Sequence, residues 1–158
     1  MAEPTIEQKK SYAIAGLREK FSAETVNDIP ALWARLAPHF GRLPAQVGGA
    51  AYGLGIDRFN TCGSFDYMAG VEVNAASGLP EGWTQITIPA QMYAIFPHDG
   101  HVSQLKDTVH TILHEWLPHA GQKHRKGAPK AVDFIEYYAA DFDPRTGMGG
   151  MQVWLALG

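Results

Sequence analysis

The amino-acid sequence predicts an α+β fold in which duplicated β-α-β-β units join into one antiparallel sheet, with two long helices on one face. Three observations lead to this prediction. Several segments alternate apolar side chains with small or polar ones, which is typical of strands. Two segments carry apolar residues at the spacing of a helix. The same order of segments occurs twice, with 81 to 83 residues between matching positions.

The first predicted elements are a strand and a helix. Tyr12–Phe21 begins apolar and becomes charged, which favours a strand. The helix follows Asn27, whose side chain can cap free N–H groups, and it tolerates Pro30 in its first turn. We expect it to end at Gly41. Its apolar stripe consists of Ile29, Leu32, Trp33, Leu36 and Phe40.

An antiparallel hairpin is predicted next, followed by a third strand. In Ala50–Asp57 the large side chains fall on one face and small residues on the other. Phe65–Val73 also alternates, so its apolar side chains share a face. After a turn-rich segment, Trp83–Ile88 alternates again and is predicted to be a strand.

The second half repeats this order. Gln91–His98 is predicted to be a strand, and His101–Leu117 a helix that ends before Pro118. Strands are expected at Asp133–Tyr138 and Met151–Leu157. The helical stripe consists of Val102, Leu105, Val109, Ile112, Leu113 and Trp116.

Matching residues support an internal duplication. Tyr12-Ala13-Ile14, followed by a helix containing Trp33, corresponds to Tyr93-Ala94-Ile95, followed by a helix containing Trp116. We therefore expect one domain spanning residues 1–158, with pseudo-repeats at about 5–88 and 89–158.

Composition restricts the classes of partner. A net charge of −3 and a pI near 6.1 give no general attraction to nucleic acid or to anionic membranes. The start of the chain has no apolar signal segment, and no stretch is long and apolar enough to span a bilayer. The single cysteine, Cys62, excludes an internal disulfide. We expect a cytoplasmic protein that binds neither nucleic acid directly nor membranes.

Glu136 is the most informative candidate for a functional site. Alternation places Phe134, Glu136 and Tyr138 on one face of their strand. A carboxylate between two rings can act as a counter-ion for a cation or as a general acid or base. The alternative is an ordinary acid on a solvated face, because charged residues are mostly exposed.

Aromatic side chains in the middle of other strands are further candidates. Tyr52, Tyr67 and Trp154 can form flat walls with a polar tip, and Phe96 is a weaker candidate. Packing in the core is the competing interpretation for each of them. Trp33 and Trp116 lie on helical stripes and are expected in the core.

No metal site or cofactor is expected. His110 and His114 have the four-residue spacing of metal ligands, but they lie off the apolar stripe and no further ligand pattern accompanies them. Cys62 has no local signature of a nucleophile. Asp141 and Asp143 lack the remaining ligands of a calcium loop.

Several short motifs in a fixed order resemble one family. They are Tyr93-Ala94-Ile95-Phe96, Gly100, Glu115-Trp116-Leu117-Pro118, Asp133-Phe134-Ile135-Glu136-Tyr137-Tyr138 and Asp143-Pro144-Arg145-Thr146-Gly147, together with Phe65–Val73 and Leu79-Pro80-Glu81-Gly82-Trp83. This order resembles the GyrI-like small-molecule-binding family, which includes the effector-binding domains of bacterial AraC-type and MerR-type transcription regulators.

The resemblance implies a cleft between the two units that accepts hydrophobic, cationic or planar aromatic molecules. It also implies a buried acid in the penultimate strand, where Glu136 falls. We therefore expect a stand-alone small-molecule-binding protein of the effector-sensing type. Its expected ligand-binding residues are Glu136, Tyr52, Tyr67, Phe96, Phe134, Tyr138 and Trp154.

The resemblance leaves two alternatives open. One is a hydrolase of reactive cyclopropane-bearing electrophiles, in which Glu136 is catalytic. The other is a module that binds a protein partner, as gyrase inhibitors do.

Overall fold

A computed structural model describes most of the chain. It covers residues 4–22, 24–25, 28–39, 46–56, 64–74, 82–98, 100–116, 132–143 and 146–156. Within these ranges, the side chains of Lys106, Leu113, Val132, Asp133 and Phe134 lie outside the description.

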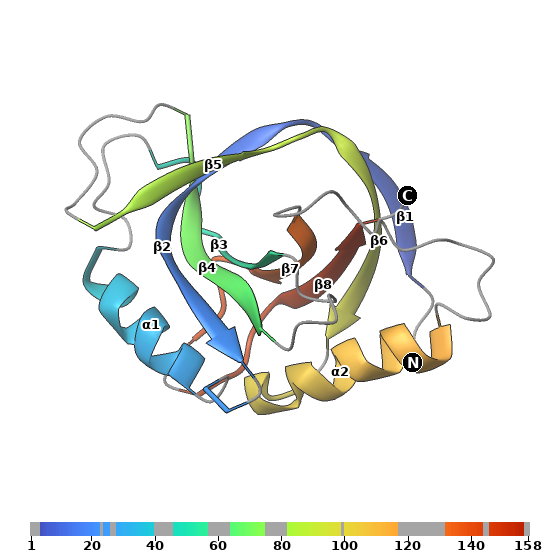
Figure 1. Ribbon diagram of the computed structural model, residues 1–158. Coiled ribbons are helices and arrows are strands. Elements are labelled where there is room, and N and C mark those ends of the chain that lie inside the picture. The colour runs from blue at the N-terminus through green and yellow to red at the C-terminus, as the bar shows by residue number, and fades with distance from the viewer. Residues whose placement is uncertain are drawn as a thin grey trace.

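The strands form one antiparallel sheet of eight strands, in the order β1-β6-β8-β7-β3-β4-β2-β5 (Figure 1). Helices α1 and α2 lie against it on the same side, which confirms the predicted α+β class. The strands are β1 (Thr5–Lys9), β2 (Tyr12–Ser22), β3 (Ala51–Ile56), β4 (Ser64–Val73), β5 (Thr84–Ile88), β6 (Gln91–His98), β7 (Val132–Tyr138) and β8 (Met151–Ala156). Seven of these are the predicted strands, with ends shifted by no more than one residue.

The two helical segments cover nearly the expected residues, 29–39 and 102–116, but only part of each is α-helical. Helix α1 (Ile29–Leu36) has eight residues and continues as a 3-10 turn at 37–39. Pro30 occupies its first turn as predicted, whereas Asn27 and Gly41 lie outside the described residues. Helix α2 (Leu105–Thr111) has only seven α-helical residues, because a 3-10 turn precedes it and the wider π-helical turn 112–116 follows it.

Strand β1 is the element that the sequence pattern does not reveal. Its sequence TIEQK contains a single apolar residue, and most of its side chains are exposed. The segment is a strand because it pairs with β6, from Thr5 opposite Ile95 to Lys9 opposite Gln91. Pairing with a neighbour therefore outweighs weak strand propensity here.

The strand order has an internal symmetry. Each half of the chain contains a strand-helix-strand-strand run, β2-α1-β3-β4 and β6-α2-β7-β8. In each run the first strand pairs with the last, and the two runs meet where β3 pairs with β7. Strand β1 precedes the first run but pairs with β6 of the second run. Strand β5 precedes the second run but pairs with β2 of the first, so the two runs exchange these strands.

The sheet also curls until its two ends join. Only two residues separate β1 from β2, and only two separate β5 from β6. Lys9 lies opposite Gln91 and Tyr12 lies opposite Ile88, so the β1–β6 and β2–β5 pairings keep the same register. The β1–β2 run and the β5–β6 run therefore pair as two long strands. The ladder is interrupted at Pro89, which has no N–H to donate.

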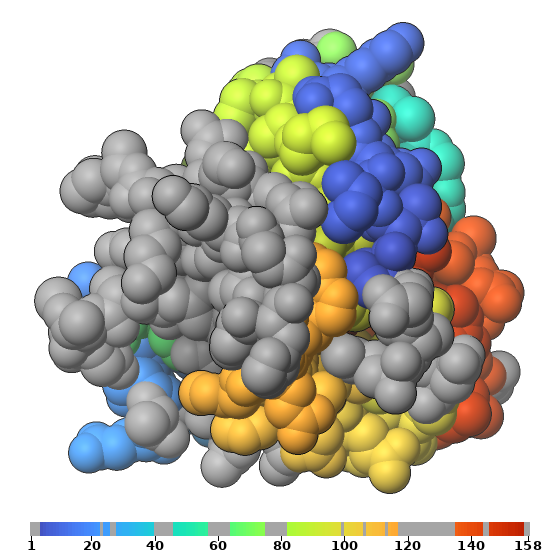
Figure 2. Space-filling model, turned by 90° about the vertical axis from the view of Figure 1, so that its right-hand side faces the viewer, coloured from blue at the N-terminus to red at the C-terminus, as the bar shows by residue number. Residues whose placement is uncertain are grey.

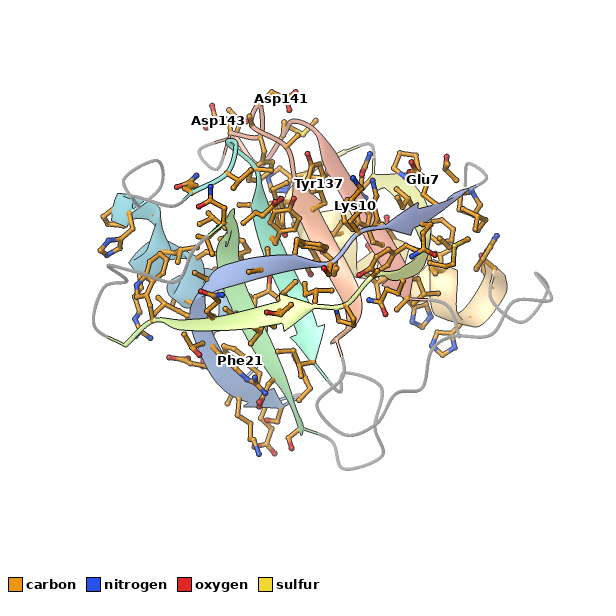
Figure 3. All side chains as sticks on the ribbon, turned by 90° about the horizontal axis from the view of Figure 1, so that it is seen from above. Glu7, Lys10, Phe21, Tyr137, Asp141 and Asp143 are labelled. Carbon is orange, nitrogen blue, oxygen red and sulfur yellow. The ribbon has the colours of Figure 1, made fainter. Side chains whose placement is uncertain are left out.

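The views of the molecule agree with this closure. Figure 1 shows the strands arranged as a ring. In Figure 2, the blue β1–β2 run lies beside the yellow-green β5–β6 run, and the golden-yellow α2 and the orange turn 112–116 lie below. Figure 3 shows the β1–β2 and β5–β6 runs side by side, with Lys10 at the corner of the first run and Phe21 near its far end.

The curled sheet has an inner and an outer face, each with its own core. The inner cluster consists of Ile14, Tyr52, Leu54, Ile56, Met68, Ile88, Tyr93, Ile95, Ile135, Trp154 and Ala156. On the outer face, α1 covers β2 and β4, while α2 covers β6, β7 and β8. Trp33 of α1 contacts both outer clusters, so it lies where the two helix-covered regions meet.

Candidate functional site

The carboxylate of Glu136 lies on the outer face of β7 and is the centre of a hydrogen-bonded group. Its Oε1 accepts a hydrogen bond from the Tyr67 hydroxyl at 2.7 Å and another from the Tyr138 hydroxyl at 2.9 Å. Tyr67 comes from β4, and Tyr138 lies two residues after Glu136 on β7. Alternation along β7 therefore places Tyr138 on the same face as Glu136.

Helix α1 adds a third aromatic side chain to this group. The Trp33 indole Nε1 donates to the Tyr67 hydroxyl oxygen at 3.0 Å. The same indole meets the Tyr138 ring edge to face, with 5.3 Å between ring centroids and an interplanar angle of 75°. We call Trp33, Tyr67, Glu136 and Tyr138 the acid cluster.

A glycine on β3 makes room for the acid cluster. Gly53 is the ladder partner of Glu136 on one side and of Ala69 on the other. A Cβ atom at Gly53 would overlap the Tyr67 hydroxyl and would lie 2.7 Å from Glu136 Oε1. The predicted face of small residues on β3 thus leaves the space in which the Tyr67 hydroxyl contacts Glu136.

Burial determines the protonation of the two tyrosines. Tyr67 is 1% exposed and Tyr138 is 8% exposed, whereas Glu136 is partly buried. Burial, followed by the negative charge of Glu136, raises the pKa of Tyr67 and of Tyr138 far above the ordinary value. Both hydroxyls therefore keep their protons near neutral pH and act as donors to the carboxylate.

The structure brings together three of the expected site residues, namely Glu136, Tyr67 and Tyr138. Phe96 is fully buried on the same outer face, in the cluster that contains Tyr138, and its ring meets Trp116 edge to face at 4.9 Å. For Phe134 only the backbone is described, opposite Gly55 in the β3–β7 ladder.

The structure does not bring Tyr52 and Trp154 to Glu136. Both side chains belong to the inner cluster, where Tyr52 contacts Tyr137 at 5.5 Å and Trp154 at 6.2 Å between ring centroids. Tyr52 precedes Gly53, whose Cβ direction points at Glu136, so its own side chain points to the opposite face. The expectation that these two rings share a wall with Glu136 is not met.

Trp33 belongs to the acid cluster, although its place on an apolar helical stripe predicts the core. Its ring does pack against buried neighbours, but its side chain is only partly buried. A tryptophan N–H needs an acceptor when it is buried. That requirement is the signal by which the sequence could have indicated a polar partner for Trp33.

Two negative findings concern the described residues only. Among them, no group of three or more histidine, cysteine, aspartate or glutamate side chains could hold a metal ion. The rings of His110 and His114 lie 4.2 Å apart between centroids, tilted by 39°, and both side chains are exposed. No helix within the described ranges is sufficiently long and apolar to cross a membrane.

Comparison with known sequences identifies related proteins. The model of the family described as "GyrI-like small molecule binding domain" matches residues 2–156. The transcriptional regulator BrlR of Pseudomonas aeruginosa is 31% identical over 141 residues. This match covers 87% of the present chain and 48% of BrlR, so the chain spans about half the length of that relative.

Solved structures share the fold at low identity. The structure of SAV2435 bound to tetraphenylphosphonium has a TM-score of 0.73 and 18% identity, with 99% of this chain and 94% of that chain covered. The C-terminal domain of EcmrR has a TM-score of 0.68 and 13% identity, with 99% and 97% of the two chains covered. At these identities the likeness concerns the fold.

Proposed function

We propose that this chain, which belongs to the GyrI-like family of small-molecule-binding domains, captures a hydrophobic organic cation at Glu136. The observation that carries the proposal is a carboxylate held by two tyrosine hydroxyls among aromatic side chains. Such a group offers charge and apolar surface together, which is what a hydrophobic cation requires.

The electrostatics favour a cation over a neutral ligand. A carboxylate only accepts hydrogen bonds, and Oε1 of Glu136 accepts two from buried hydroxyls, so the charge complement of this group is a cation. A cation close to an aromatic face gains a further contribution of about 0.5–2 kcal/mol. Partial burial strengthens both effects, because a charge pair is screened less away from bulk water.

The binding cleft that we propose lies between α1 and the outer face of β3, β4 and β7. Trp33 and the two tyrosines would line it, and Glu136 would form its charged end. The symmetric strand order supports a duplicated domain in which β1–β4 correspond to β5–β8, so that the second repeat includes β5 and begins a few residues before the predicted boundary at 89. Strands β3 and β7, which carry Gly53 and Glu136, form the junction of the two repeats.

Two relatives support the class of ligand and the role. SAV2435 has been solved with tetraphenylphosphonium, which is a hydrophobic organic cation. BrlR is a transcriptional regulator, and the present chain matches about half of it. Sensing of an effector molecule is therefore the role that we propose for binding at Glu136.

Titration calorimetry with tetraphenylphosphonium tests the proposal. Glu136→Gln keeps the shape of the side chain and removes its charge, so affinity should fall about tenfold or more, which corresponds to about 1.4 kcal/mol or more. Glu72→Gln is the matched control, because Glu72 is the ladder partner of Ile14, a residue of the inner cluster. Equal affinity of the parent and Glu136→Gln would exclude the proposed site.

The same preparation separates binding from hydrolysis. Incubation with a cyclopropane-bearing electrophile should leave the compound intact, while a stoichiometric complex forms. Product formation that disappears in Glu136→Gln would instead establish the enzymatic alternative.

A further inference from the structure

We infer that Trp33 is a positioning residue: its indole N–H fixes the direction in which the Tyr67 hydroxyl donates, and thereby holds Glu136 as the carboxylate that selects a cation. This inference rests on the proposed function and assigns a role to a residue that does not itself carry the charge.

The direction of the hydrogen bonds follows from the chemistry of the groups. An indole N–H can only donate, so the Tyr67 oxygen accepts from Trp33 at 3.0 Å. The proton of Tyr67 then points to Glu136 Oε1 at 2.7 Å. Because Tyr67 is almost completely buried, bulk water does not compete for this proton.

The effect on Tyr67 strengthens its bond to the carboxylate. A hydroxyl that accepts one hydrogen bond becomes a better donor in the next, because the groups polarise one another. The effects on the pKa of Tyr67 are consistent with this: burial and the charge of Glu136 raise that pKa, whereas the hydrogen bond from Trp33 lowers it. Trp33 therefore makes Tyr67 more acidic towards Glu136 than it would otherwise be.

The position of Trp33 extends this effect to helix α1. The indole contacts Tyr138 as well as Tyr67, so one side chain touches both donors to Glu136. Leu32 and Leu36, on the same helix, are buried in the outer core and fix α1 on the sheet. A ligand that draws on the charge of Glu136 will consequently alter the environment of a side chain on α1.

A double-mutant cycle tests the role of Trp33. The variants are Trp33→Phe, Tyr67→Phe and the two combined, and each is titrated with tetraphenylphosphonium. Trp33→Phe keeps an aromatic ring but loses the N–H, and it should weaken cation binding about three- to tenfold. When Tyr67 is already phenylalanine, the further change at Trp33 should alter affinity less than about twofold.

Two controls separate positioning from packing. Trp116→Phe is the same substitution at the end of the π-helical turn that follows α2, where the indole meets Phe96 edge to face, and it should leave cation affinity unchanged. Triphenylphosphine oxide serves as a neutral probe, and its affinity should be the same for the parent and Trp33→Phe. An equal loss for both probes, or an equal loss in the Tyr67→Phe background, would show packing alone and would overturn the inference.

A measurement without ligand keeps the inference separate from the proposed function. In spectra of the ¹⁵N-labelled indoles, the Trp33 N–H resonance should move in Tyr67→Phe and in Glu136→Gln. The Trp154 N–H, which donates to Gln152 at 2.8 Å on the inner face, should not move. If the parent binds no cation, the proposed function fails, while an unmoved Trp33 resonance would overturn the positioning role by itself.

Discussion

Gly53 lies directly opposite Glu136 in the β3–β7 ladder, and the space left by its missing side chain is where the carboxylate meets the Tyr67 hydroxyl. The glycine and the acid come from different halves of the chain and form one structural unit. Four predictions follow from this arrangement and from the closed sheet that supports it.

Gly53→Ala should weaken the binding of tetraphenylphosphonium about tenfold or more, as measured by calorimetry. The new methyl group would occupy the position of the Tyr67 hydroxyl and force it away from Glu136. Gly49→Ala is the control, because its Cβ would contact only Ala140, at 3.0 Å from the nearest atom. Equal affinities for Gly53→Ala and the parent would contradict the prediction.

Removing a hydroxyl should matter on the outer face and not on the inner face. Tyr67→Phe and Tyr138→Phe each delete a donor to Glu136 and should lower cation affinity about three- to tenfold. Tyr52→Phe should leave affinity unchanged, because Tyr52 lies in the inner cluster. A loss in Tyr52→Phe as large as in Tyr67→Phe would mean that the ligand reaches the inner face.

Alkaline pH should destabilise the fold through its buried tyrosines. Burial raises the pKa of Tyr67 and Tyr138, and also of Tyr12 and Tyr52, above the ordinary value of about 10. Below about pH 10 these groups are protonated in both states, so their contribution to stability is constant. At higher pH the unfolded chain loses protons that the folded chain retains, and the free energy of unfolding falls.

Urea unfolding between pH 8 and 11 measures this slope. The free energy of unfolding of Tyr67→Phe should decline less steeply above pH 10 than that of the parent, because the variant lacks one hydroxyl that stays protonated only in the folded state. Absorbance at 295 nm, which follows the ionisation of tyrosine hydroxyls, provides the test that could contradict this prediction. If all these hydroxyls ionise with ordinary pKa values while the chain stays folded, the assignment of buried donors is wrong.

Lys9→Met should lower the free energy of unfolding by about 0.5–1 kcal/mol, because the Lys9 ammonium lies over an aromatic ring. Its Nζ atom is 5.0 Å from the centroid of the Trp154 ring. Lys10→Met is the matched control, since Lys10 is the exposed neighbour at the β1–β2 corner. Urea unfolding compares the two variants, and equal stabilities would show that the Lys9 contact contributes nothing.

The sequence alone predicts part of the acid cluster. Glu136 and Tyr138 are two residues apart on one strand, so alternation puts them on one face. The alternation of β3 also indicates a face of small residues, which is where Gly53 lies. These features are local and need no knowledge of the neighbouring strand.

Relations between strands are not contained in such patterns. Whether Tyr52 or Gly53 faces Glu136 depends on the β3–β7 register, which pairs residues 83 positions apart. The pattern also cannot tell that Trp33 lies above Tyr67, because that depends on how α1 docks on β4. Strand β1 is missed for a similar reason, since pairing with β6 and not its own composition makes it a strand.

The exchange of β1 and β5 has a consequence for biosynthesis. Thr5 finds its ladder partner, Ile95, only after 90 further residues have been added to the chain. Strand β1 is thus synthesised long before its ladder partner and is among the last strands to be immobilised, which favours slow and concerted folding. If the chain were divided between β4 and β5, the first fragment would hold β1, the partner of β6, and the second would hold β5, the partner of β2. Each fragment would then donate a strand to the other, so the molecule resembles a swapped dimer joined into one polypeptide.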